Sequence, residues 1–204
     1  MKIDFYFDPS CPWCWITSRW LLLTSNKRDL EINWKLFSLA WKNGELEKNS
    51  KKNWHQSSHR VERVMHEANK KGADMLNMYT AFGIRHFLSG DDYSDELIKE
   101  VLDQLKLDPK LLSYADNESI DEELIKSSKE ALSAIGEDIG VPTIVIHDGK
   151  NSRGFFGPVL SELPTQEEAV KIWDSIVELS KIKYFSELKK GRNGGPDVYS
   201  TAKC

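Results

Sequence analysis

The segment Pro-Ser-Cys-Pro-Trp-Cys-Trp-Ile at residues 9–16 constrains this chain more than any other feature. It separates Cys11 from Cys14 by two residues, and the chain of 204 residues has only one further cysteine, Cys204. Such a pair can bind a metal, form a structural disulfide or carry out thiol chemistry. The sequence around the pair helps to distinguish these possibilities.

A buried strand is predicted at residues 2–8, because this segment is rich in β-branched and aromatic side chains. Ser10 is the expected N-cap of the helix that follows. The free backbone N–H groups and the dipole at a helix N-terminus stabilise a thiolate, which is the reactive form of cysteine. The first cysteine of such a pair is the more exposed, so Cys11 is the predicted nucleophile and Cys14 the resolving thiol.

A zinc site and a pair of inert thiols are the alternatives to redox chemistry. A structural zinc ion needs four ligands, and the five histidines of the chain show no paired spacing around a second knuckle. If the two thiols were inert and buried, nothing would explain why the cysteine pair lies at a strand-to-helix turn. Both alternatives stay open, but the position of the pair favours redox chemistry.

The composition of the chain indicates in which compartment, and with which kinds of partner, this chemistry takes place. Three cysteines do not make a disulfide framework, and no apolar run has the length of a signal peptide or a membrane span. A net charge of -4 argues against a general nucleic-acid binder. We therefore expect a cytoplasmic protein without a nucleic-acid or membrane partner. In that reducing compartment a cysteine pair is more often catalytic or metal-binding than structural.

The pattern of the whole chain predicts an α/β fold in two parts. A second strand at 31–39, a hairpin within 140–157 and a final helix from Pro164 complete a four-stranded mixed sheet flanked by helices. Residues 61–139 have the pattern of four or five helices, with Ser94 and Asp108 as expected N-caps and the last helix ending at Gly136. The polar residues 44–60 are predicted to be a solvated loop or helix face. The predicted domains are a sheet domain of residues 1–43 and 140–190, a helical insertion of residues 44–139, and a disordered or loosely docked tail of residues 191–204.

Val141-Pro142-Thr143 opens the predicted third strand, where a proline is unusual because it cannot donate a hydrogen bond to the sheet. In an α/β redox fold such a proline typically follows a cis bond, and we predict one between Val141 and Pro142. The Val141 backbone would then lie close to the nucleophilic sulfur, where a substrate can pair with it. The alternative is a simple proline at a strand start.

A few more polar and aromatic side chains are candidates for the site. Asn43 follows the second strand and could be a polar group near the sulfur, although a loop asparagine is more often a turn residue. His86 in the helical part could act as an acid or base, and Tyr79 lies near it in sequence, but most such residues are surface or satisfied helix positions. Four tryptophans are assigned to the core: Trp15, Trp20, Trp34 and Trp173.

The order of these elements resembles the thioredoxin fold of the DsbA family, with its helical insertion. Three segments, at residues 5–20, 134–143 and 155–161, resemble the actinobacterial mycothiol-dependent reductases, some of which are called nitroreductases. The lysine- and asparagine-rich segment 44–60 departs from that family. The resemblance implies that Cys11 attacks, that Cys14 resolves, and that Trp13 contributes to the substrate surface. The predicted substrate-binding residues are Pro12, Trp13, Val141, Pro142, Thr143 and Asn43.

The resemblance also implies a cytoplasmic enzyme that takes electrons from the low-molecular-weight thiol mycothiol and reduces disulfides or nitro compounds. We expect a thiol-disulfide oxidoreductase without a bound cofactor, acting as a monomer or homodimer on a small-molecule or protein disulfide. A kappa-class glutathione transferase or isomerase on the same fold is one alternative, although those enzymes generally lack the second cysteine. A non-enzymatic thiol-binding or chaperone module is another.

Overall fold

The computed structural model describes residues 1–46, 54–149, 151–192 and 194–202. Its sheet has four strands: β1 (Lys2–Phe7), β2 (Glu31–Leu36), β3 (Thr143–Asp148) and β4 (Asn151–Phe156). They lie in the order β2-β1-β3-β4, with β1 parallel to β2 and the other pairs antiparallel. The predicted four-stranded mixed sheet is therefore confirmed. Ile3, Phe5 and Phe7 are fully buried, which explains the apolar character of the central strand β1.

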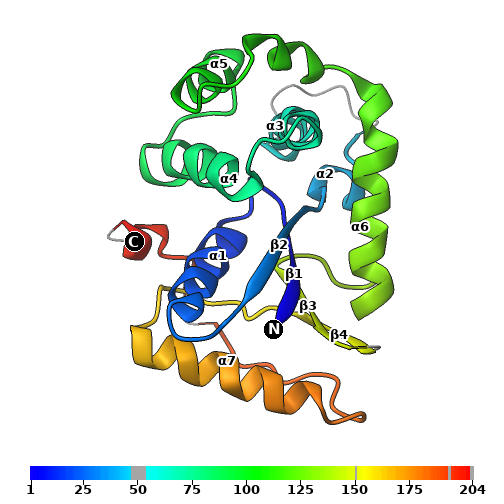
Figure 1. Cartoon of the computed structure of the whole chain (residues 1–204), viewed down its shortest axis with the longest axis vertical. Helices are drawn as coiled ribbons and strands as arrows, with labels where there is room; N and C mark the ends of the chain where they lie inside the picture. Colours follow the sequence, from blue (N-terminus) through cyan, green and yellow to red (C-terminus); the bar gives the residue numbers. More distant parts are fainter. Residues whose placement is uncertain (47–53, 150, 193, 203–204) are drawn as a thin grey trace.

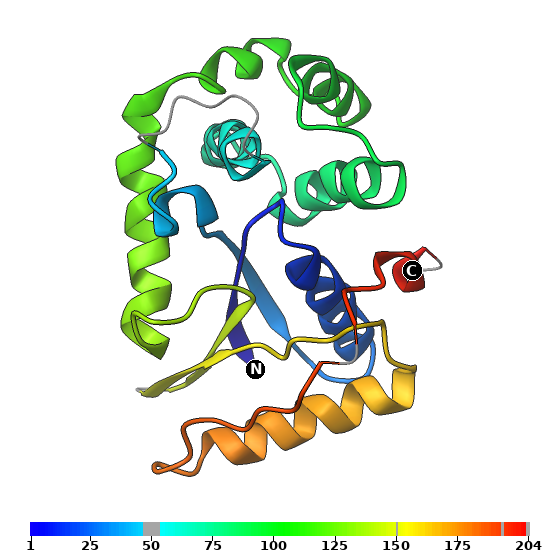
Figure 2. The same cartoon turned by 180° about the vertical axis from the view of Figure 1, so that it is seen from behind.

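Helices cover both faces of this sheet (Figures 1 and 2): α1 (Pro12–Ser25) and α7 (Gln166–Ser180) lie on one face, and α6 (Asp121–Ile135) lies on the other. Trp20 of α1 donates its indole N–H to the Ala169 carbonyl of α7 at 3.0 Å, and its ring packs against Trp173. The core assignment of the tryptophans is confirmed, since three are fully buried and Trp34 packs against the core.

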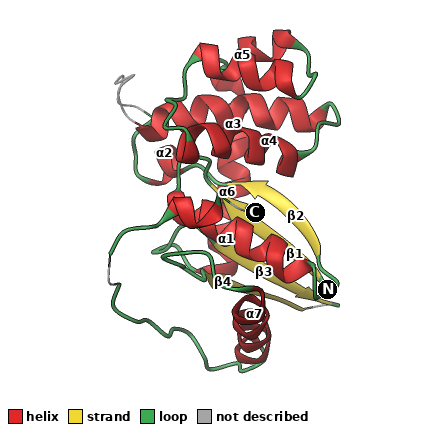
Figure 3. Ribbon diagram, turned by 90° about the vertical axis from the view of Figure 1, so that its left-hand side faces the viewer, coloured by secondary structure: helices red, strands yellow, loops and turns green. Residues whose placement is uncertain are grey.

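A group of helices covers one end of the sheet, as Figure 3 shows. These elements are α2 (Leu39–Lys42), α3 (Trp54–Lys70), α4 (Met75–Gly83), the π-helix η1 (Ile84–Leu88), α5 (Asp95–Gln104), and the 3-10 helices η2 (Pro109–Tyr114) and η3 (Glu118–Ile120). Ser94 and Asp108 cap α5 and η2 as predicted, and Gly136, with a positive φ, ends α6.

Helix α6 belongs by contact to both parts of the molecule. It packs against α3 in the helical part and against β2, β3 and β4 of the sheet. The domain boundaries therefore stay a prediction, because the segment predicted as an insertion supplies one layer of the sheet domain. None of the described helices is long and apolar enough to cross a lipid bilayer.

The C-terminal segment corrects the expectation of a disordered or loosely docked tail. Residues Val198–Thr201 form the 3-10 helix η4, which packs against α1 and η1. Thr201 is buried, and its hydroxyl accepts a hydrogen bond of 2.8 Å from the indole N–H of Trp15. A buried indole N–H requires such a partner, and this one long-range contact is invisible in the local sequence. Cys204 lies outside the described residues.

Candidate active site

The turn from β1 to α1 lies at the end of the sheet that faces α3 and α4 (Figure 1). This turn carries Cys11, and Cys14 lies in the first turn of α1. Cys11 donates its backbone N–H to the Asp8 carbonyl at 3.0 Å. Its sulfur accepts the backbone N–H of Cys14 at 3.3 Å, so Cys11 is the N-cap of α1. The prediction that Ser10 is the N-cap is wrong, because the N–H and the hydroxyl of Ser10 both donate to Asp8 Oδ1, at 2.8 and 2.6 Å.

The two thiols are free and differ in their surroundings. Cys11 retains 6% of its surface, whereas Cys14 is completely buried. Burial, and then the hydrogen bond and charge of Cys11, raise the pKa of Cys14 well above its ordinary value. Cys14 therefore stays a protonated thiol when Cys11 is ionised, and Cys11 is the less buried residue of the two.

The backbone before β3 approaches the Cys11 sulfur. The Val141–Pro142 peptide bond is cis, as predicted, and the Val141 carbonyl oxygen lies 3.9 Å from Cys11 Sγ. Thr143 is buried at the start of β3 and donates its hydroxyl to the Gly140 carbonyl at 2.6 Å. The structure thus brings the predicted segment 141–143 against the cysteine pair, and its part in binding a substrate stays a prediction.

Trp13, between the two cysteines, is half-buried. The guanidinium of Arg192 lies 4.7 Å from the centre of its ring, within the range of a cation–π contact. Sequence reasoning missed Arg192, since it placed this residue in the tail and no local pattern joins the two segments. An exposed positive charge therefore lies beside the residue that separates the thiols.

Asn43 takes a different position from the other predicted residues. It is the exposed C-cap of α2, and its side-chain nitrogen lies 3.4 Å from Nδ1 of His55 on α3. Within the described part of the chain, no hydrogen bond joins Asn43 to the cysteine turn. Its role as a substrate-binding residue stays a prediction.

The aromatic side chains singled out in the helical part lie near the site. Tyr79 is fully buried, with its ring stacked on Phe7 at 3.9 Å between centres. His86 stacks on Tyr93 at 4.3 Å, and the Tyr93 hydroxyl donates to the Pro9 carbonyl at 2.8 Å. Burial lowers the pKa of His86. The π-helix η1 therefore places an imidazole on the helical side of the cysteine turn.

Polar side chains of α3 lie buried beneath the cysteine turn, which corrects the prediction of a solvated face at 44–60. Ser58 and His59 are buried, as are Glu62 and Arg63 beyond that range. Ser58 donates its hydroxyl to Asp8 Oδ1 at 2.8 Å. The expectation was wrong for Ser58 and His59, because Ser58 donates to Asp8 and His59 pairs with Glu62 and Asp121. Residues 47–53 of the predicted loop lie outside the described residues.

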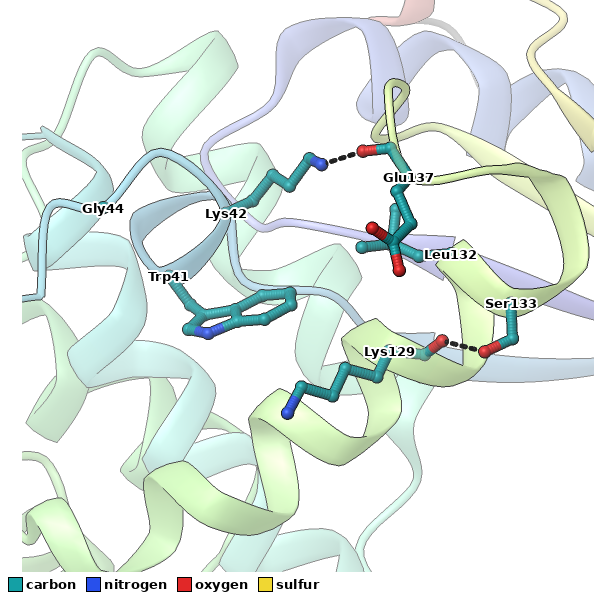
Figure 4. A pocket seen from close by; sticks show the side chains of 7 residues that line it. All are labelled: Trp41, Lys42, Gly44, Lys129, Leu132, Ser133 and Glu137. Atoms are coloured by element: carbon teal, nitrogen blue, oxygen red, sulfur yellow. Dashed lines mark hydrogen bonds between the residues drawn. The ribbon is translucent and has the colours of Figure 1, made fainter.

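A groove of about 560 Å³ lies between α2 and α6 (Figure 4). Lys42 donates to the Glu137 carbonyl at one side of it, and the indole of Trp41 and the side chain of Lys129 line the other. None of the predicted site residues lines this groove. Among the described side chains, no three His, Cys, Asp or Glu are placed to hold a metal ion.

Comparison with known sequences assigns a family to this arrangement. Residues 10–190 match the profile of the Rv2466c-like family, described as mycothiol-dependent nitroreductase Rv2466c. The chain belongs to this family. The membership supports a thiol-dependent redox role, and the matched residues include Cys11, Cys14 and the Val141–Pro142 bond.

This chain is also similar to other known proteins. The chain is 26% identical over 198 residues to an uncharacterized protein of Mycobacterium tuberculosis, Rv2286c, covering 94% of this chain and 82% of that one. The fold of the present chain is similar to that of a probable DsbA oxidoreductase, SCO1869, from Streptomyces coelicolor, with a TM-score of 0.60, 17% identity and 97% of each chain covered. It is also similar to the cytosolic disulfide reductase DsbM from Pseudomonas aeruginosa with GSH, with a TM-score of 0.62, 12% identity, and 87% and 100% coverage. At these identities the two structures show the fold alone, which is the thioredoxin-like fold of DsbA proteins.

Proposed function

We propose that this protein is a thiol-disulfide oxidoreductase that reduces disulfides or nitro compounds with electrons from mycothiol. The observation that carries the proposal is the difference between its two thiols. Cys11 caps a helix and retains a small exposed surface, whereas Cys14 is completely buried and its pKa is raised. A pair in which one sulfur attacks and the other waits as a thiol has the chemistry of thiol-disulfide exchange.

The proposed reaction of a disulfide has two exchange steps. The Cys11 thiolate attacks one sulfur of the substrate, forms a mixed disulfide and releases the other sulfur as a thiolate. Cys14 loses its proton and attacks the Cys11 sulfur, which releases the second thiolate and leaves a Cys11–Cys14 disulfide. Two molecules of mycothiol then supply two electrons, restore both thiols and become a mycothiol disulfide. No bound cofactor is needed in this sequence.

We propose that substrates bind along the surface formed by Trp13 and the segment 141–143. The support is the Val141 carbonyl, which lies 3.9 Å from Cys11 Sγ and can accept a hydrogen bond from a bound chain or thiol. The proposal also includes Pro12 and Asn43 as further residues that contact the substrate. The partner thiol is of low molecular weight, and the oxidised substrate is a small molecule or a protein disulfide.

The family resemblance, rather than any feature of the fold, supports a cytoplasmic location. The alternative of a kappa-class transferase or isomerase draws support from a 2-hydroxychromene-2-carboxylate isomerase of similar fold, with a TM-score of 0.61 at 15% identity. Cys14 argues against it, because a transferase that activates a single thiol has no use for a buried resolving partner. A thiol-binding or chaperone module would leave the same residue without a role.

The proposal is tested by steady-state reduction of a small aromatic disulfide with mycothiol as the donor. We expect the wild-type protein to turn over, Cys11→Ser to fall to the background rate, and Cys14→Ser to lose multiple turnover. Cys204→Ser is the matched control, since it removes the thiol outside the proposed pair and should retain full activity. Replacement of mycothiol by glutathione tests the donor. Turnover by Cys11→Ser at the wild-type rate would refute the assignment.

A further inference from the structure

Asp8 connects the cysteine turn to the helical part of the molecule. Its carboxylate is completely buried and accepts four hydrogen bonds of 2.6–2.8 Å, from the N–H and hydroxyl of Ser10, the hydroxyl of Ser58 and the N–H of Leu39. Its carbonyl accepts the N–H of Cys11. The orientation of the Asp8 carboxylate therefore fixes the turn that presents the nucleophile.

Glu62 on α3 lies beside Asp8. It is completely buried, and its carboxyl lies within hydrogen-bonding reach of the Asp8 carboxylate. Its Oε2 lies 2.7 Å from Nδ1 of His59, while no described residue donates a hydrogen bond to its Oε1. Two buried carboxylates this close together repel unless one holds a proton. A proton on Glu62 would satisfy Oε1 by donation to Asp8.

The proton belongs to Glu62 rather than to Asp8. Four donors stabilise the ionised form of Asp8, whereas Glu62 has His59 alone. Burial and the charge of Asp8 raise the pKa of Glu62 to about 8. A glutamic acid in this position is mostly neutral at neutral pH.

The charges behind Glu62 balance when it is neutral. Burial opposes the charge of His59, but hydrogen bonds to Asp121 and Glu62 raise its pKa to about 9. Arg63 pairs with Asp121 through two bonds of 2.6 and 2.7 Å. With Glu62 neutral, this buried group holds two cations, His59 and Arg63, and two anions, Asp8 and Asp121. An ionised Glu62 would add a buried, unpaired negative charge.

Three further titratable groups interact electrostatically with Asp8 or Glu62. The charge of Asp8 acts on Cys14 and on His86, and the charges of Asp8 and Glu62 both act on Tyr93. The Tyr93 hydroxyl is already committed to the Pro9 carbonyl. None of the three has a hydrogen bond to Glu62 among the described contacts, so they leave the proton between the two carboxyls.

We propose that Glu62 holds one proton against Asp8 and thereby keeps the Asp8 carboxylate in place beneath the Cys11 turn. Glu62 is then a positioning residue for the nucleophile, supplied by the helical part rather than by the sheet. When Glu62 ionises, the two carboxylates repel each other, and the bonds that hold Ser10 and the turn weaken. Cys11 then reacts more slowly than its own ionisation would allow.

The pH dependence of Cys11 alkylation tests the positioning role. We compare Glu62→Gln, whose amide donates to Asp8 at every pH, with the unchanged residue, both in a Cys204→Ser background. The ratio of the unchanged to the variant rate constant with iodoacetamide should fall about tenfold between pH 7 and pH 9, as the protonated fraction of Glu62 falls. Effects of pH on the thiol itself cancel in this ratio. A ratio that stays constant to pH 9 would overturn the proposal.

Glu67→Gln is the matched control, since Glu67 lies on the same helix and pairs with Lys70 at 3.3 Å. The ratio of the unchanged rate constant to that of Glu67→Gln should stay constant with pH. A fall in this ratio equal to the fall with Glu62→Gln would also contradict the assignment. Neither experiment uses a reductase assay, so the inference and the proposed function can fail separately.

Infrared spectroscopy reads the proton directly. At neutral pH the unchanged protein should show the C=O stretch of a protonated carboxylic acid, and Glu62→Gln should lose this band. Asp8→Asn provides a second variant: its amide donates to Glu62, which should then ionise and lose the band as well. Unchanged protein without a band assignable to Glu62 would refute the shared proton, whatever the reactivity of Cys11.

Discussion

At the scale of single residues, the site depends on hydrogen bonds that only the folded chain provides. Cys11 replaces a hydroxyl residue as the cap of α1, because the Ser10 hydroxyl is bound to Asp8. The indole of Trp15, directly after Cys14, donates its N–H to Thr201 near the other end of the chain. These contacts join the cysteine turn to α3 and to η4.

The bond between Trp15 and Thr201 gives a prediction at this scale. Thr201→Val keeps the shape of the side chain and leaves a buried indole N–H without an acceptor, which should lower the free energy of unfolding by about 1–3 kcal/mol. Tyr199→Phe is the control, since Tyr199 lies in the same turn and is 66% exposed. It should change stability by less than about 0.5 kcal/mol. Equal stability of the two variants in urea unfolding would show that η4 contributes nothing to the fold.

At the scale of elements, periodic patterns predicted the sheet, the cap residues of α5 and η2, and the end of α6. These features arise from local spacing, so the sequence was sufficient. The buried polar face of α3 was not predictable, because Ser58, His59 and Glu62 look solvated until Asp8 and Asp121 are placed against them. The docking of η4 escaped prediction for the same reason.

The contact between α1 and α4 gives a prediction at this scale. A Cβ added at Gly83 of α4 would lie 2.2 Å from the ring of Trp15, which is 1% exposed and cannot withdraw. Gly83→Ala should therefore lower stability by about 1–3 kcal/mol through overpacking, despite a helix propensity that favours alanine by about 1 kcal/mol. Gly191→Ala, which meets open space, is the control. A stabilised Gly83→Ala protein in thermal unfolding would show that the two helices are not tightly packed.

At the scale of the whole molecule, the sheet part and the helical part meet at the cysteine turn. The sheet part supplies Cys11, Cys14 and the Val141 carbonyl, and the helical part supplies Glu62 and the hydroxyl of Tyr93. Helix α6 contacts both parts, so the helical part is not a separate appendage. The fold and the redox class follow from the sequence motif and the family, while the ionic network is visible only in three dimensions.

The intact mass of the Cys14→Ser protein, in a Cys204→Ser background, tests the central claim most directly. After exposure to mycothiol disulfide, this protein should gain the mass of one mycothiol, located on Cys11 by peptide mapping and removed by a reductant. The adduct accumulates because the resolving thiol is gone. Cys11→Ser in the same background should gain far less, since Cys14 is completely buried. Equal labelling of Cys14 in that control, or no adduct on Cys11, would contradict the assignment of Cys11 as the nucleophile.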